Sequence, residues 1–228
     1  MLRTALVITT FCAAGIVMYS SGAMAQCAAR DALSTTMPKA SSVVAPATVH
    51  QVGDAPKAWK TIMLGAFANS FALRNALDAA SCGTGDLAEE ALARPAFSLA
   101  SSKADVDLAV VTAAELGFRA KSVPLRDIYA RAEKLGLNLA PAEVGPALRL
   151  QYLDQPIGEF LHVGMKPIVT WQGDPVIFVV VNGGAGLILI GKNVNADAQM
   201  PARSAFLFLR PRELQTVTRD QVRVADKV

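Results

Sequence analysis

The chain has 228 residues, 52 % of them hydrophobic, and a formal net charge of +3 at pH 7, which is enough material for one folded domain with a sizeable core. The basic residues are scattered without a run of three, a distribution that excludes a nucleic-acid partner. Aromatic residues make up only 6 %, with tryptophan at positions 59 and 171 alone, too few for a sugar-binding surface of several stacked rings.

Residues 1–25 have the pattern of an export signal. Arg3 supplies the charged start, an apolar stretch runs from Ala5 to Tyr19, and Ala23-Met24-Ala25 forms a small-x-small cleavage pattern. The alternative is an uncleaved membrane anchor, but this stretch is shorter than the ~20 apolar residues that span a bilayer. We therefore predict cleavage after residue 25, a periplasmic or secreted mature protein, and no stable membrane insertion.

Residues 26–56 are rich in Ala, Ser, Thr, Pro and Val and are predicted to form a flexible leader. Cys27 in this leader and Cys82 both follow the predicted cleavage site. In an oxidising compartment they can form a disulfide. A free Cys27 and a small, buried Cys82 are the alternatives, and both readings stay open because a bridge demands a specific geometry.

The first half of the predicted domain, which covers residues 57–212, combines strands and helices. In chain order we expect a strand over 57–64, helices over 68–80 and 87–93, a strand over 105–112 and a helix over 124–135. Asn69 or Ser70 caps the first helix, and Asp86 with Glu89 opens the second as a capping box. The helix that starts at Pro124 has the clearest apolar stripe.

The second half reads as a run of strands. They are expected over 148–152, 159–165, 168–171, 176–182, 186–191 and 205–210. Turn residues between several of these runs, Gln-Gly-Asp-Pro and Asn-Gly-Gly-Ala-Gly, are typical of consecutive hairpins. Residues 148–152 alternate between apolar and polar side chains and are predicted to form an edge strand. Residues 213–228 are charged and are predicted to be a mobile tail.

This order of elements predicts an α+β domain, an antiparallel meander sheet with two to three helices on one face. The core residues should then come from both helices and strands. The predicted core consists of Leu108, Val110, Ile128, Leu135, Leu150, Leu161, Val163, Ile177, Val179, Leu187, Leu189 and Phe206.

Several phrases of the chain resemble those of one group of sequences. They include Pro141-Ala-Glu-Val-Gly-Pro, Arg149-Leu-Gln-Tyr, Gly158-Glu-Phe-Leu-His and Asn182-Gly-Gly-Ala-Gly. With these phrases the chain resembles an uncharacterised family of bacterial hypothetical proteins, over about residues 59–211. The resemblance implies no activity.

One constellation of residues would suit an enzyme. Cys82 could act as a nucleophile with His162 as its base, and Glu159 or Asp154 could orient the imidazole. The order of Cys82 and a later His-Val-Gly is similar to that of papain-like cell-wall amidases and endopeptidases. Those enzymes place the cysteine at the start of a long buried helix, whereas Cys82 precedes Gly-Thr-Gly-Asp and a short helix.

A second set of residues would suit a binding module. Glu143, Arg149 and Gln151 form a polar cluster that could orient a ligand, and the predicted edge strand could accept an added strand. The alternative for Arg149 is an internal ion pair with Glu143 or Glu159.

The chain lacks the ligand spacing of a zinc site and the glycine fingerprints of nucleotide sites, so no metal or cofactor is expected. The sequence therefore favours an exported, non-catalytic domain that binds a protein, peptide or envelope component. The alternative is the thiol hydrolase.

Overall fold

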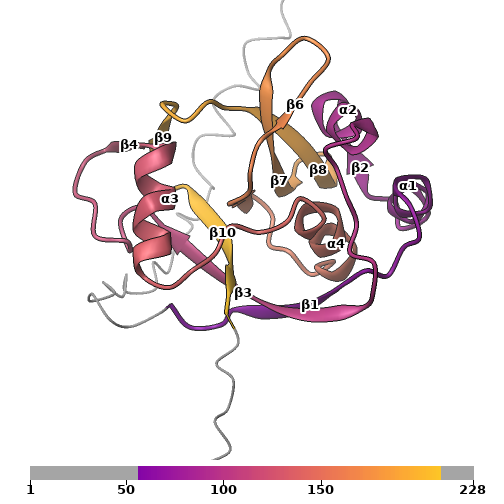
Figure 1. Cartoon of the computed structure of the whole chain (residues 1–228), viewed down its shortest axis with the longest axis horizontal. Helices are drawn as coiled ribbons and strands as arrows, with labels where there is room; N and C mark the ends of the chain where they lie inside the picture. Colours follow the sequence, from indigo (N-terminus) through magenta and orange to yellow (C-terminus); the bar gives the residue numbers. More distant parts are fainter. Residues whose placement is uncertain (1–55, 212–228) are drawn as a thin grey trace, which may run out of the picture. The chain divides into compact units, whose positions relative to one another are not determined.

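The computed structural model describes residues 56–211 (Figure 1). The predicted signal peptide, almost all of the leader and the tail lie outside these residues. Within them the helices are α1 (Ser70–Ala79), α2 (Asp86–Ala93), α3 (Leu125–Lys134) and α4 (Val144–Gln151). The strands are β1 (Lys60–Leu64), β2 (Gly83–Thr84), β3 (Ala104–Thr112), β4 (Ser122–Pro124), β5 (Phe160–Val163), β6 (Ile168–Val169), β7 (Pro175–Gly183), β8 (Gly186–Asn193), β9 (Gln199–Pro201) and β10 (Ala205–Arg210).

Most strands belong to one curled sheet with the order β1-β3-β10-β5-β7-β8-β2, to which β6 is added beside β7. Its pairs are antiparallel except for β10 with β5 and β2 with β8. The domain is therefore α+β with a mostly antiparallel sheet. The hairpin of β7 and β8 has the predicted turn, with Gly183 opposite Gly186.

A consecutive meander is not confirmed, because the last strand, β10, lies between β3 and β5. Local turn signals predict which consecutive strands form hairpins. They carry no information about where β10 inserts, because β9, the strand before it, pairs with β4 in a separate two-stranded sheet.

The helices cover both faces of the sheet. On one face, Tyr129 of α3 packs edge-on against Phe206 and Phe208 of β10, with ring centroids 6.4 Å and 5.8 Å away. On the other face, Gly145 of α4 lies so close to Phe178 of β7 that a Cβ would come within 2.8 Å of it. The register places these aromatic rings on opposite faces. Phe206 pairs with His162 of β5, and His162 pairs with Val179 of β7, so these three side chains point to one face. Phe178 is the next residue to Val179 and therefore points to the other face.

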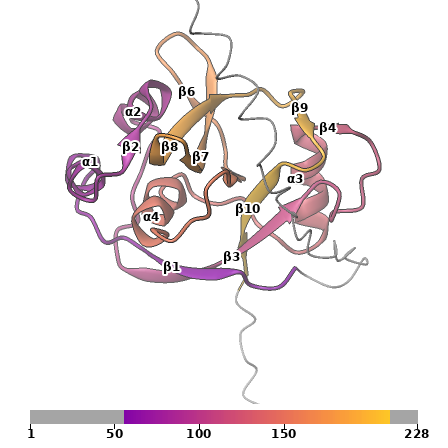
Figure 2. The same cartoon turned by 180° about the vertical axis from the view of Figure 1, so that it is seen from behind.

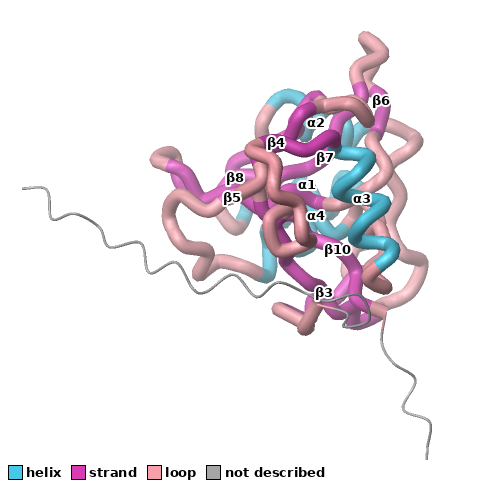
Figure 3. Tube along the Cα trace, turned by 90° about the vertical axis from the view of Figure 1, so that its left-hand side faces the viewer, coloured by secondary structure: helices cyan, strands magenta, loops and turns pink. Residues whose placement is uncertain are grey.

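Helix α2 lies on the same face as α4. It packs against Gly191 of β8, which is opposite Phe178. Figures 1 and 2 show the sheet curving around α4, with β1 on one side of the helix and β7 and β8 on another, and with α1 beside it. The side view in Figure 3 shows α3 running beside β10. The predicted helical layer is thus present, but α3 belongs to the opposite face, which its apolar stripe alone could not indicate.

The predicted edge strand over residues 148–152 is wrong, because these residues belong to helix α4 and its end. Pro146 occupies the first turn of this helix, where a missing N–H breaks no hydrogen bond. Residues 144–149 are all buried. The apolar and polar alternation therefore reflects a helix enclosed on all sides and not a half-exposed strand.

The first two helices agree with the prediction except at one cap. The Asn69 side chain caps α1 by accepting a hydrogen bond from the backbone N–H of Ala72 at 2.9 Å. Helix α2 starts at Asp86 itself, and its capping residue is Gly85 without a side-chain bond, so the predicted capping box is wrong. Glu89 forms an ion pair with Arg74 of α1 instead.

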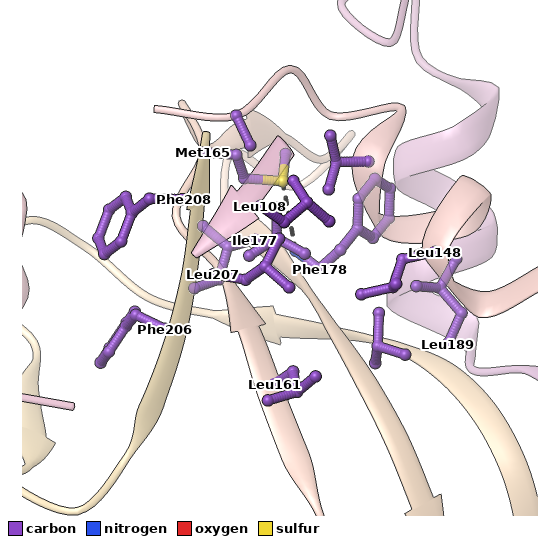
Figure 4. Packing of buried hydrophobic residues seen from close by; sticks show 14 of the residues in the cluster. Leu108, Leu148, Leu161, Met165, Ile177, Phe178, Leu189, Phe206, Leu207 and Phe208 are labelled. Atoms are coloured by element: carbon purple, nitrogen blue, oxygen red, sulfur yellow. Dashed lines mark hydrogen bonds between the residues drawn. The ribbon is translucent and has the colours of Figure 1, made fainter. Parts of the chain in front are cut away.

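The predicted core is confirmed. Val110, Leu150 and Leu187 are half-buried, and the other predicted core residues are buried. Figure 4 shows part of this core, in which side chains of β3, β5, β7, β8, β10 and α4 meet. Between residues 56 and 211 no helix has the length and apolar character needed to cross a membrane.

Candidate functional site

Cys82 is a free thiol in the core, with 3 % of its surface exposed, and it directly precedes β2. Its Sγ lies 3.8 Å from the carbonyl oxygen of Ala80 and 4.0 Å from that of Arg149. The surroundings of Cys82 are therefore backbone carbonyls and the interior face of α4, including the guanidinium of Arg149, with which the thiol interacts. The second cysteine of the disulfide hypothesis, Cys27, lies outside the described residues.

His162 lies on β5 and is 7 % exposed. Its Nδ1 is 3.2 Å from the carbonyl oxygen of Ala205, and its Nε2 is 3.3 Å from Nζ of Lys192. A carbonyl oxygen only accepts, so Nδ1 is assigned the proton, and the lone pair of Nε2 accepts from the lysine ammonium. The imidazole also packs on Phe206, with ring centroids 5.2 Å apart.

Strands β7 and β8 separate the two halves of the predicted thiol-hydrolase pair. Across the sheet, Gly83 of β2 pairs with Ile188 of β8, and Ile188 pairs with Val181 of β7. Val181 pairs with Phe160 of β5. Cys82 lies next to Gly83, at one end of this path, and His162 lies near Phe160, at the other. Three strand spacings correspond to roughly 14 Å along the sheet. The structure therefore does not bring Cys82 and His162 together as a nucleophile and its base.

The residues proposed to orient the imidazole do not do so either. Asp154 is exposed, and the carboxylate of Glu159 interacts with Tyr152 and Arg149. Burial, followed by the charge of Glu159, raises the pKa of Tyr152 to about 12. The orientation of His162 comes from the Ala205 carbonyl and from Lys192.

The predicted binding residues of α4 are occupied by the protein's own backbone. Glu143 is 2 % exposed, and its two carboxylate oxygens each accept a hydrogen bond of 2.7 Å, one from the N–H of Gly65 and one from that of Ala100. The amide of Gln151 both accepts from the N–H of Met63 and donates to its carbonyl, at 2.9 Å in each case. The side-chain amide of Gln151 thereby pairs with the backbone of Met63 at the edge of the sheet, as a residue of a neighbouring strand would.

Arg149 has no exposed surface and donates to three acceptors, one on β7 and two in the stretch after α4. Its guanidinium donates to the carbonyl oxygen of Val181 at 3.0 Å, to that of Tyr152 and to Oε1 of Gln155. Burial lowers the pKa of Arg149, and Cys82, Tyr152 and Glu159 counteract this effect. Arg149 is therefore scaffolding, although its direct hydrogen bonds go mainly to carbonyl groups and not to the carboxylates of the predicted ion pair.

His162 and Glu159 both line a cleft of about 530 Å³. The cleft is formed by β5, the end of β8 and the turn between β9 and β10. This volume is within the usual range for pockets that bind small molecules. The side chains that give the cleft its chemical character are Glu159, Phe160, His162, Lys192, Arg203 and Ser204.

The cleft has an excess of positive charge. Burial and the neighbouring Lys192 lower the pKa of His162 to about 4, so the imidazole is neutral at pH 7. Burial also lowers the pKa of Lys192. Among residues 56–211 neither Lys192 nor the exposed Arg203 forms a salt bridge. The geometry therefore suits an anionic group.

Lys192 and Arg203 are the site residues that sequence reasoning missed. Each is a single basic residue, one near a strand end and one in a turn, and only the tertiary fold brings them to His162. Within the described part of the chain no group of three or more His, Cys, Asp or Glu residues is placed to hold a metal ion. No family model, curated protein or solved structure gives a significant match to this chain.

Proposed function

We propose that this protein is an exported, non-catalytic binding domain, and that the cleft formed by β5, the end of β8 and the turn between β9 and β10 receives part of a protein, peptide or envelope component. One observation carries the proposal. The Nε2 lone pair of His162, which a general base would use, accepts a hydrogen bond from Lys192 at 3.3 Å. His162 is then a support that positions a cation at the cleft.

The thiol-hydrolase alternative receives no comparable support. A cysteine nucleophile needs a base within hydrogen-bond reach. Cys82 instead has the carbonyl oxygens of Ala80 and Arg149 beside its Sγ, and β7 and β8 lie between it and β5.

Alkylation of Cys82 tests this choice between binding and catalysis. An activated thiolate reacts with iodoacetamide at pH 6 far faster than an ordinary thiol, which has a pKa of about 8.5. We expect Cys82 to be inert in the folded mature protein and to react only after unfolding, as followed by mass spectrometry of the peptide that contains it. The His162→Ala variant should react no differently in the folded state. Fast alkylation that depends on His162 would overturn the non-catalytic proposal.

Export is the other part of the proposal, and the pattern of residues 1–25 supports it. N-terminal sequencing of the exported protein should begin at Gln26. A mature protein that retains Met1 would contradict this.

A further inference from the structure

Lys192 is held at the wall of the cleft with donors to spare. Its Nζ donates to Nε2 of His162, and an ammonium group carries more N–H donors than this single bond uses. The neutral imidazole leaves the positive charge of Lys192 uncompensated. His162 is itself fixed by the Ala205 carbonyl, so the lysine is positioned before any ligand arrives.

Arg203 adds a second cation to the same cleft. Its side chain is exposed, and no carboxylate pairs with it among the described residues. Glu159, the one acidic residue that lines the cleft, already interacts with Tyr152 and Arg149. The two cations are therefore available to a ligand.

An apolar surface adjoins these charges. Phe160 is 49 % exposed, although large aromatic side chains are usually covered. It precedes His162 by two positions on β5, so both side chains point to the same face and lie about 7 Å apart along the strand. Pro201 lines the cleft as well. The cleft thus combines basic and apolar lining residues, and its volume of about 530 Å³ accommodates more than an inorganic ion.

We propose that the cleft binds an organic anion, with a carboxylate or phosphate group on Lys192 and Arg203 and an adjoining apolar group on Phe160. The inference rests on the proposed binding function and specifies its ligand class. Carboxylate and phosphate share the chemistry that these donors recognise, and separate probes distinguish them.

Four small probes test this assignment by NMR titration of the ¹⁵N-labelled mature protein. They are 3-phenylpropionate, phenyl phosphate, the neutral 3-phenylpropionamide and propionate, which lacks the ring. We expect saturable shifts of the Phe160, Lys192 and Arg203 amides with at least one of the two aromatic anions, and the tighter of these identifies the acidic group. The amide should bind at least about tenfold more weakly, since hydrogen bonds to charged groups are the stronger kind. Propionate should bind more weakly because it cannot cover Phe160.

Variants locate the anion. Lys192→Met and Arg203→Met should each weaken binding of the aromatic anion about tenfold or more. The matched control is Lys166→Met, which removes an exposed lysine that does not line the cleft and should leave the dissociation constant unchanged. Because Arg203 is exposed, its variant should remain folded even if loss of Lys192 disturbs β8.

Each contrary outcome has its own meaning. If the amide binds as tightly as the acid, the anionic assignment is overturned while the cleft remains a binding site. If no probe binds saturably, or if Lys166→Met weakens binding as much as the cleft variants do, the inference is overturned. Failure of the proposed non-catalytic function would appear elsewhere, as His162-dependent alkylation of Cys82.

Discussion

Glu143, Arg149 and Gln151 of α4 bind backbone groups of the same chain, whereas Lys192 and Arg203 of the cleft keep positive charges that no carboxylate among the described residues neutralises. Both sets are polar residues beside strands of one sheet. Buried polar groups need partners, and the side chains of α4 find most of theirs in β1, β7 and the adjoining loops, while Nε of Arg149 is left without one within residues 56–211. The comparison teaches that polar side chains whose hydrogen bonds go to the same chain are scaffolding. Charged side chains that line a cleft without a partner of opposite charge indicate a ligand.

The same substitution at two arginines gives the largest expected contrast. Arg149→Met leaves the carbonyl groups of Val181 and Tyr152 and the Gln155 amide without their buried donor, and should lower the free energy of unfolding by about 3–5 kcal/mol. Arg203→Met changes an exposed side chain and should alter it by less than about 0.5 kcal/mol. Urea denaturation of the mature protein measures both. Similar losses for the two variants would remove the distinction between scaffold and cleft.

The pH dependence of stability should reveal how His162 is held. The pKa of His162 falls from 6.5 to about 4 on folding, because of burial and of Lys192 on β8, while the Ala205 carbonyl on β10 acts in the opposite direction. The unfolded chain therefore binds the proton more readily, and stability is lost as pH falls from about 6.5 to about 4. The fall of the pKa from 6.5 to about 4 corresponds to about 3 kcal/mol.

His162→Gln isolates this contribution, since other groups titrate in the same range but remain in both proteins. Between pH 7 and pH 4 the variant should lose less stability than the wild-type protein, as followed by urea denaturation at each pH. Parallel pH profiles would show that the pKa of His162 is the same in the folded and unfolded states.

Most of the fold could be predicted from local patterns, and the reasons for the failures are physical. Helix α3 has a full apolar stripe, and β7 and β8 are long apolar runs joined by a glycine-rich turn. Helix α4 was missed because a short apolar alternation cannot be told from a helix that is buried all round. The place of β10 depends on long-range pairing that no turn signal records.

The candidate site was only partly predictable for a related reason. His162 was identified because it is the sole histidine between residues 57 and 212, and Glu159 because it is close in sequence. Lys192 and Arg203 carry no local motif, and their proximity to His162 arises from the parallel pairing of β5 with β10 and the pairing of β7 with β8. Glu143, Arg149 and Gln151 attracted attention as polar residues among apolar ones, a pattern that scaffolding also produces, whether buried as in Glu143 and Arg149 or exposed as in Gln151.

The most direct test of the account is the protonation state of the His162 ring. A long-range ¹H–¹⁵N correlation spectrum of the imidazole distinguishes a nitrogen that carries a proton from one with a free lone pair. We predict a neutral ring from pH 7 down to about pH 5, protonated at Nδ1 toward Ala205 and unprotonated at Nε2 toward Lys192. The Nε2 resonance should move in Lys192→Met. An imidazolium at pH 6, or a proton on Nε2, would contradict the account, because His162 could then not hold Lys192 at the cleft.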